Sequence, residues 1–238
     1  MGLEKDLGSF ASLDAKSQHH YAELAAMDRS LGSLRAGLRE IGIARDTLVW
    51  FCSDNGGLPG FQPDTVGGLR GYKGSLFEGG LRVPGVIEWP KGIPSPRVTS
   101  FPAATMDIFP TVAEVVGLPA ESMLQPQDGQ SLCSLFKGEV TARRNPIGFR
   151  SAARGALVDN EFKLYMKNVE KGGFELYHLG KDPGEKENVT GNVLPIRTEP
   201  LGIGRAVVPT SPKAYQDAQQ VVAAARSGDV EFLQKWVE

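Results

Sequence analysis

The stretch that decides the fold is "TLVWFCSDNGG", residues 47–57. Residues 48–52 form an apolar run without alternation, which is typical of a strand buried on both faces in a parallel sheet. The run ends on Asp54, Asn55 and two glycines, which are residue types that usually form turns. In sheets of this kind ligands gather beyond the carboxyl ends of the strands, so Asp54 and Asn55 are also candidate oxygen ligands for a hard cation.

The segments around this strand favour a doubly wound α/β fold. Downstream, a glycine-rich loop leads to a second apolar run, "VPGVIEW" at 83–89. Upstream, apolar residues recur at steps of three and four, and Gly42 supplies a helix stop. Helix, strand, loop and strand in this order indicate an α/β architecture. The predicted core-facing side of the helix, which starts at Tyr21, carries Leu24, Met27, Leu31, Leu34, Leu38 and Ile41.

A second helix is predicted within "MDIFPTVAEVVGLP", residues 106–119. Pro110 suits its first turn and Gly117 its end, and we expect Asp107 to cap it. The side that faces inward would carry Val112, Val115 and Val116.

Residues 146–179 change character, because short alternating stretches are separated by Asp159-Asn160 and Gly172-Gly173. These are hairpin signals, so we expect a small antiparallel sheet there. The predicted organisation is an α/β part at 1–145, a small antiparallel subdomain at 146–192, a Pro- and Gly-rich linker at 193–212 and terminal helices at 213–238.

Composition excludes some function classes. The 26 Lys and Arg residues nearly balance the 28 Asp and Glu residues, so charge gives no case for binding nucleic acid or an anionic membrane. No apolar run approaches the roughly 20 residues needed to cross a bilayer, and residues 1–18 do not read as a secretory signal. Cys52 and Cys133 share no motif spacing and are expected to be buried free thiols.

Several ordered motifs closely resemble the C-terminal half of the type I sulfatases, which belong to the alkaline-phosphatase-like superfamily. They are "YAELAAMDRSLGSLRAGLREIGIARDTLVWFCSDNGG", "LRGYKGSLFEGGLRVPGVIEWP", "MDIFPTVAEVVGLP", "DGQSL" and "ELYHLGKDPGEKENV". The resemblance covers about residues 18–192. It implies part of a doubly wound sheet, a small C-terminal antiparallel sheet and, in the complete enzyme, hydrolysis of sulfate esters.

The resemblance also assigns roles to three residues. Asp54 and Asn55 match the family's late pair of divalent-metal ligands, usually for calcium. Lys73 matches the lysine that contacts the sulfate group, which makes it both a catalytic and a substrate-binding candidate. Calcium prefers oxygen ligands, and a lysine adds a compact positive charge, so the residue types suit these roles. The plain alternatives are a surface turn for Asp54 and Asn55 and a solvated loop lysine for Lys73.

Other charged residues near Lys73 are expected to support the loop. Glu78 and Arg82 would brace it through hydrogen bonds and charge pairing, and Arg70 would take a surface or ion-pair role. The glycines around Lys73 would let the backbone approach an anion closely. They are Gly67, Gly68, Gly71, Gly74, Gly79 and Gly80.

The family's nucleophile, a formylglycine made within a C/S-x-P-x-R motif, has no counterpart in this sequence. Cys52 and Cys133 lack the following Pro and Arg, and the family's early Asp-Asp metal pair is also missing. His19 and His20 are expected to be a solvated helix start rather than substitutes for the catalytic histidine, and His178 to be structural. Calcium would therefore be incompletely ligated, and the chain alone should be catalytically inactive.

Alternative interpretations stay open at this point. One is a phosphodiesterase or phosphonate hydrolase of the same superfamily, although the "GYKGSLFEGGLRVP" loop favours sulfate. Another is a non-catalytic interaction protein, because "AARSGDVE" (224–231) resembles the start of an ankyrin module. Exposed apolar surface would be covered by a complementing N-terminal half or by oligomerisation. The family is often exported, while the start of this chain carries no export signal.

Overall fold

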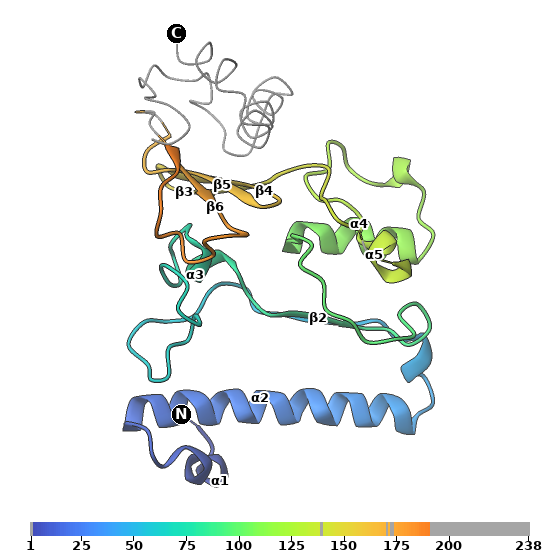
Figure 1. The fold of residues 1–238 in the computed structure, drawn as a ribbon. Helices are drawn as coiled ribbons and strands as arrows, with labels where there is room; N and C mark the ends of the chain where they lie inside the picture. Colours follow the sequence, from blue (N-terminus) through green and yellow to red (C-terminus); the bar gives the residue numbers. More distant parts are fainter. Residues whose placement is uncertain (1, 139, 170, 172–173, 191–238) are drawn as a thin grey trace.

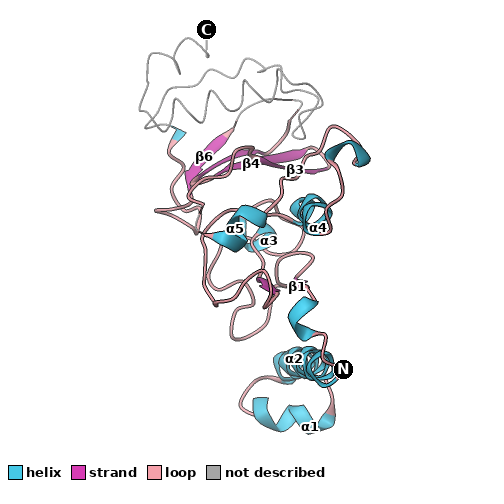
Figure 2. Ribbon diagram, turned by 90° about the vertical axis from the view of Figure 1, so that its right-hand side faces the viewer, coloured by secondary structure: helices cyan, strands magenta, loops and turns pink. Residues whose placement is uncertain are grey.

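A computed structural model describes residues 2–138, 140–169, 171 and 174–190. The predicted linker at 193–212 and the predicted helices at 213–238 lie outside the described residues. Figure 1 shows a stack of layers, with a long helix on one side, a pair of strands next to it, short helices beyond and a four-stranded sheet on the opposite side; the view turned by 90° in Figure 2 agrees. The main elements are α2 (Ala15–Glu40), β1 (Val49–Cys52), α3 (Glu78–Leu81), β2 (Gly85–Glu88), α4 (Ile108–Val115), α5 (Cys133–Lys137), β3 (Ile147–Ser151), β4 (Arg154–Asp159), β5 (Phe162–Met166) and β6 (Glu175–His178).

Helix α2 begins earlier than predicted because of a local cap. The Asp14 carboxylate accepts a hydrogen bond from Ser17 N at 3.1 Å, so the helix starts at Ala15 rather than Tyr21. Gly42 follows its end with φ of +78°, which is the predicted stop. The short helix α1 (Glu4–Leu7) is attached to α2 by an ion pair between Asp6 and Arg29.

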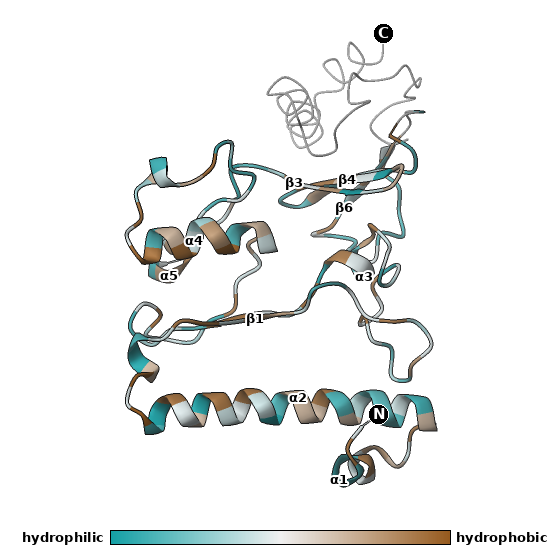
Figure 3. Cartoon of the chain, turned by 180° about the vertical axis from the view of Figure 1, so that it is seen from behind, coloured by the Kyte–Doolittle hydropathy of each residue, from teal (hydrophilic) through white to brown (hydrophobic). Residues whose placement is uncertain are grey.

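The prediction of a core-facing apolar side on α2 was wrong. Leu24, Met27, Leu34 and Ile41 are 42–67% exposed, and the buried residues of α2 are Ser17 and Ala22. Strands β1 and β2 run along one side of α2, and α1 lies on the opposite side near the start of the helix, so the remainder of that opposite side stays open (Figure 1). Apolar residues recur along the open helix in Figure 3.

Helix α4 differs from its prediction in the same way. Val112 is 40% exposed and Val116 is 63% exposed, whereas Pro110, Thr111 and Ala113 are buried. Thr111 turns inward because its hydroxyl makes two hydrogen bonds, donating to Asp107 O at 2.6 Å and accepting from Leu132 N at 2.9 Å. These hydrogen bonds, rather than the apolar pattern, therefore determine which side of α4 faces inward.

Strand β1 pairs antiparallel with β2, from Val49 opposite Glu88 to Cys52 opposite Gly85. The apolar run predicted a strand of a parallel sheet buried on both faces, yet all four residues of β1 are only half-buried. Among the described strands β2 is its one partner, so its other edge stays open. On the helix side, Arg35 of α2 donates to the Glu88 carboxylate from Nε at 2.5 Å and from Nη2 at 3.1 Å.

The predicted small antiparallel sheet is confirmed. Its strands follow in the order β3-β4-β5-β6, each antiparallel to the next. The tight turns contain Ala152 and Asn160, with φ of 53° and 55°. One face of the sheet packs against loop residues that include Leu76 and Phe77, and it carries Ile147, Ala156, Val158, Tyr165 and Tyr177.

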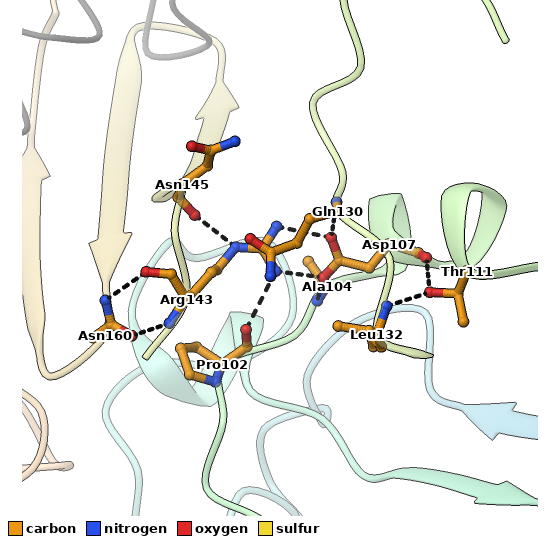
Figure 4. Close-up of polar contacts among 9 residues, drawn as sticks. All are labelled: Pro102, Ala104, Asp107, Thr111, Gln130, Leu132, Arg143, Asn145 and Asn160. Atoms are coloured by element: carbon orange, nitrogen blue, oxygen red, sulfur yellow. Dashed lines mark hydrogen bonds and ion pairs between the residues drawn. The ribbon is translucent and has the colours of Figure 1, made fainter. Parts of the chain in front are cut away.

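A buried ion pair joins the α4 region to this sheet (Figure 4). Arg143 donates from Nη1 to Asp107 Oδ2 at 2.6 Å and from Nη2 to Asp107 Oδ1 at 2.7 Å, and both side chains are 0% exposed. Asp107 also accepts from Ala104 N and Gln130 N, each at 2.8 Å. The predicted capping of α4 by Asp107 was wrong, because these partners occupy its carboxylate.

Within the described part of the chain, no helix has the length and apolar character that spanning a bilayer requires.

Both cysteines are free thiols, as predicted, but they differ in burial. Cys133 is buried and Cys52 is half-buried. Burial raises the pKa of the Cys133 thiol, which makes it less reactive than an exposed cysteine.

Candidate functional site

The turn that follows β1 is short and internally fastened. Ser53 N donates to Pro84 O at 3.3 Å, which extends the pairing with the β2 side by one bond. The Ser53 hydroxyl donates to Asn55 O at 2.8 Å and closes the turn. Asp54 is exposed and Asn55 is half-buried. The structure thus places both residues at the carboxyl end of β1, as predicted.

The loop that carries Lys73 lies against this turn. Lys73 N donates to Gly57 O at 2.9 Å, two residues beyond Asn55. On the other side of the turn, Gly56 N donates to Gly80 O at 3.0 Å. Lys73 itself is exposed. The backbone therefore brings together the three residues that the sequence singled out, although they are separated by a long loop.

Glycines make this close approach possible. A Cβ on Gly56 would lie 1.9 Å from Gly79 O, and a Cβ on Gly79 would lie 2.0 Å from Gly71 O. Gly71 also has φ of +77°, a conformation that other residues rarely adopt. At these positions the missing side chains permit contact between backbone segments rather than the approach of an anion. Gly67, Gly68 and Gly74 meet no neighbouring atom within 4 Å, so they have room on their open side.

The donor set fits a calcium ion in type but falls short in number. A carboxylate and a carboxamide supply the oxygen ligands that calcium prefers, and calcium normally takes six to eight of them. Within the described residues there is no group of three or more His, Cys, Asp or Glu that could hold a metal ion. The ligand role of Asp54 and Asn55 therefore stays a prediction, and two such ligands alone would leave a calcium shell incomplete.

Two of the three histidines pack on aromatic rings, which matches the structural role predicted for His178 but not the solvated helix start predicted for His19 and His20. His20, near the start of α2, stacks on Phe61 with ring centroids 4.2 Å apart and an interplanar angle of 27°. His178, at the end of β6, lies 4.6 Å from the Phe162 ring. His19 precedes His20 on the same helix and is half-buried.

The braces predicted for the Lys73 loop are present. Arg82 Nε lies 2.7 Å from Glu78 Oε2, as expected. Arg70 stacks its guanidinium on the Phe77 ring at 3.8 Å and donates to the Tyr177 hydroxyl at 2.9 Å. Burial, followed by a hydrogen bond to Glu175, raises the pKa of Tyr177 to about 12, so this phenol remains a neutral partner.

Two residues that hold this loop, Lys163 and Glu185, were not singled out from the sequence. Lys163 Nζ lies 3.1 Å from Glu78 Oε1, and Glu185 accepts from Glu78 N at 2.5 Å. Lys163 stands on an alternating strand, where a charged residue is expected to face solvent. A useful signal was available for Glu185, because it belongs to "ELYHLGKDPGEKENV", one of the quoted motifs.

Comparison with known proteins gives one consistent result. Residues 11–118 match the family described as Sulfatase. The chain is 40% identical over 123 residues to a steryl-sulfatase of Mus musculus, covering 48% of this chain and 19% of that protein. It is 32% identical over 218 residues to a sulfatase of Formosa agariphila, covering 79% of this chain and 38% of that protein. The chain thus spans well under half the length of these curated relatives.

Solved structures show the same similarity in three dimensions. The crystal structure of Ps i-CgsB in complex with k-i-k-neocarrahexaose has 28% identity and a TM-score of 0.68, over 81% of this chain and 43% of that one. The PsFucS1 sulfatase from Pseudoalteromonas sp. has 21% identity and a TM-score of 0.58, over 87% of this chain and 42% of that one, which bears on the fold alone. These matches confirm the fold class predicted from the sequence.

Proposed function

The chain belongs to the sulfatase family, and on this basis we propose that it forms the C-terminal part of a hydrolase acting on sulfate esters. The observation that carries the proposal is the hydrogen bond from Lys73 N to Gly57 O, which sets the lysine loop beside the Asp54–Asn55 turn. A cation and a lysine at one sheet edge are the groups that a sulfate anion requires.

Each residue then has a distinct role. Lys73 contacts the sulfate group and follows the negative charge that develops on its oxygens during cleavage. Asp54 and Asn55 would hold part of a calcium shell, with the remaining ligands supplied by groups outside this set. When bound, such a cation neutralises the anion and polarises an S–O bond. The formylglycine nucleophile of the family would also have to come from outside this sequence, which lacks the C/S-x-P-x-R motif.

Sulfate is favoured over phosphodiester or phosphonate substrates by the relatives themselves. Their names include sulfatase, steryl-sulfatase and arylsulfatase A. We extend this substrate class, sulfate esters, to the present chain.

The exposed apolar side chains fit the same proposal. Leu24 and Met27 on α2 and Val116 after α4 stand open to solvent, although the sequence pattern predicts that they face a core. A complementing part of a sulfatase, in the same polypeptide or as a separate chain, would bury them. In this proposal residues 1–145 complete the catalytic α/β domain and residues 146–192 form its C-terminal subdomain.

The decisive experiment is to determine the coding sequence upstream of Met1 and to express the protein it specifies. An in-frame C/S-x-P-x-R motif is expected, with hydrolysis of an aryl sulfate. Lys73→Ala should then lower kcat roughly 100-fold or more, as loss of a charge-stabilising group does in other enzymes. The exposed Lys167→Ala is the matched control and should retain full activity. Absence of the motif both upstream of Met1 and from any chain that copurifies with the expressed protein, or hydrolysis of phosphodiesters in place of sulfates, would overturn the proposal.

A further inference from the structure

Glu185 holds both ends of the segment that carries Lys73. Arg70, at the start of this segment, donates from Nη1 to the Glu185 carbonyl oxygen at 2.9 Å. Glu78, at its end, donates its backbone N–H to Glu185 Oε2 at 2.5 Å. These contacts span 115 and 107 positions in the sequence. One residue that is distant in the sequence therefore contacts both ends of segment 70–78.

The cluster around Glu185 is buried and balanced in charge. Lys163 and Glu185 have side chains that are 0% exposed, and Glu78 is 6% exposed. Lys163 Nζ lies 3.1 Å from Glu78 Oε1 and 2.9 Å from Glu185 Oε1; the second contact is an ion pair outside hydrogen-bond geometry. Arg82 pairs with the other carboxylate oxygen of Glu78, so the two carboxylates of the cluster are matched by two cations. Buried charges are costly unless paired, so the cluster tolerates few alternative arrangements.

A rigid turn presents Glu185 to the loop. Glu185 has φ of 51°, which a non-glycine residue keeps only where its surroundings impose it. The turn is closed by Glu185 N donating to Asp182 O at 3.1 Å and by Lys186 N donating to Asp182 Oδ2 at 2.6 Å. Farther on, Val189 N donates to Leu176 O at 2.8 Å and attaches the segment to β6. Glu185 is thus fixed to the four-stranded sheet.

We propose that Glu185 is a positioning residue for the sulfate-binding loop: it fixes Arg70 and Glu78, and through them the place of Lys73 beside the Asp54–Asn55 turn. The chemical meaning of this inference rests on the function proposed above, since only there does Lys73 contact sulfate. The inference assigns the small antiparallel subdomain a part in building the site, although no strand of that subdomain carries a predicted catalytic residue.

Hydrogen exchange of backbone amides tests this inference on the chain as it exists, without ligand. The variants are Glu185→Ala and Glu185→Gln, with the exposed Glu187→Gln as the matched control. Glu185→Ala should speed exchange of the Gly56, Lys73 and Gly79 amides roughly tenfold or more, while the amides shared by β4 and β5 keep their wild-type rates. Glu185→Gln keeps an acceptor for Glu78 N and should give a smaller increase in the same amides. Glu187→Gln should change none of them.

Two results would overturn the inference. One is unchanged exchange of the loop amides in both Glu185 variants. The other is an equal increase in the loop and in the sheet, which would make Glu185 a general structural residue. If Glu185→Ala does not fold, Glu185→Gln decides alone, since it preserves the shape of the side chain. Failure of the proposed function would appear separately, as absent sulfate hydrolysis by the complete protein with the exchange pattern intact.

Discussion

Gly56 and Gly79 approach so closely that a Cβ added to Gly56 would lie 1.9 Å from the Gly79 carbonyl oxygen. This contact joins the turn after β1 to the helix that ends the Lys73 loop. The spacing leaves no room for a methyl group unless one backbone segment moves.

Gly56→Ala should therefore destabilise the chain by about 1–3 kcal/mol, the usual cost of overpacking a tight site. The matched control is Gly32→Ala, which lies in α2 with no atom within 4 Å of the added Cβ. That change should stabilise the chain by about 0.5–1 kcal/mol, because alanine favours a helix over glycine. Urea unfolding of both variants measures the two effects, and effects of the same sign would contradict this account of the contact.

Arg143→Ala should be among the most destabilising single changes in the described chain. It removes a bidentate partner and leaves the Asp107 carboxylate buried and unpaired, which costs about 3–5 kcal/mol. The neighbouring exposed Arg144→Ala should stay within about 0.5 kcal/mol of wild type. Thermal unfolding distinguishes them, and a small loss for Arg143→Ala would show that water reaches Asp107.

Tyr177 should titrate well above the usual range of a tyrosine. Its pKa rises from 10.0 to about 12, chiefly through burial, so folding favours the neutral phenol. The stability that this provides is complete below pH 10 and is lost as the pH rises from 10 towards 12. Since each pKa unit corresponds to about 1.4 kcal/mol, the loss amounts to roughly 2–3 kcal/mol.

An alkaline absorbance titration measures this effect directly. The difference between wild type and Tyr177→Phe should show one phenol with a midpoint near 12. A difference with a midpoint at or below 10 would mean that Tyr177 is solvated.

The purified chain alone should not hydrolyse an aryl sulfate. Its sequence lacks the motif that yields the nucleophile, and covalent catalysis cannot begin without one. Turnover that copurifies with the chain and is abolished by Lys73→Ala would contradict this. Turnover unaffected by that substitution would identify a contaminating enzyme.

Local patterns in the sequence predicted much of the site region. The apolar run before Asp54 predicted the strand, and the turn residues after it predicted where the strand ends. Hairpin signals such as Asp159-Asn160 predicted the small sheet. These features depend on neighbouring residues and backbone preferences, so the sequence carries them directly.

The parts that sequence patterns missed depend on distant contacts. Alternation places Lys163 with the residues that face solvent, yet two carboxylates from other segments bring it into the interior. Leu24 and Met27 satisfy a helical core pattern, yet the described chain leaves them 42% and 44% exposed. A periodicity shows that a face suits a core but does not show which segment covers that face.

The central claim is that Asp54, Asn55 and Lys73 belong to one site, and a paramagnetic lanthanide tests it most directly. Lanthanides, like calcium, are hard cations that prefer oxygen ligands. Added to the isotope-labelled chain, the ion should broaden the amide signals of Gly56 and Lys73 first. Asp54→Ala should abolish that broadening, and Asp28→Ala on α2 should leave it unchanged. Broadening centred elsewhere, or a Lys73 signal that stays sharp while Gly56 disappears, would contradict a shared site.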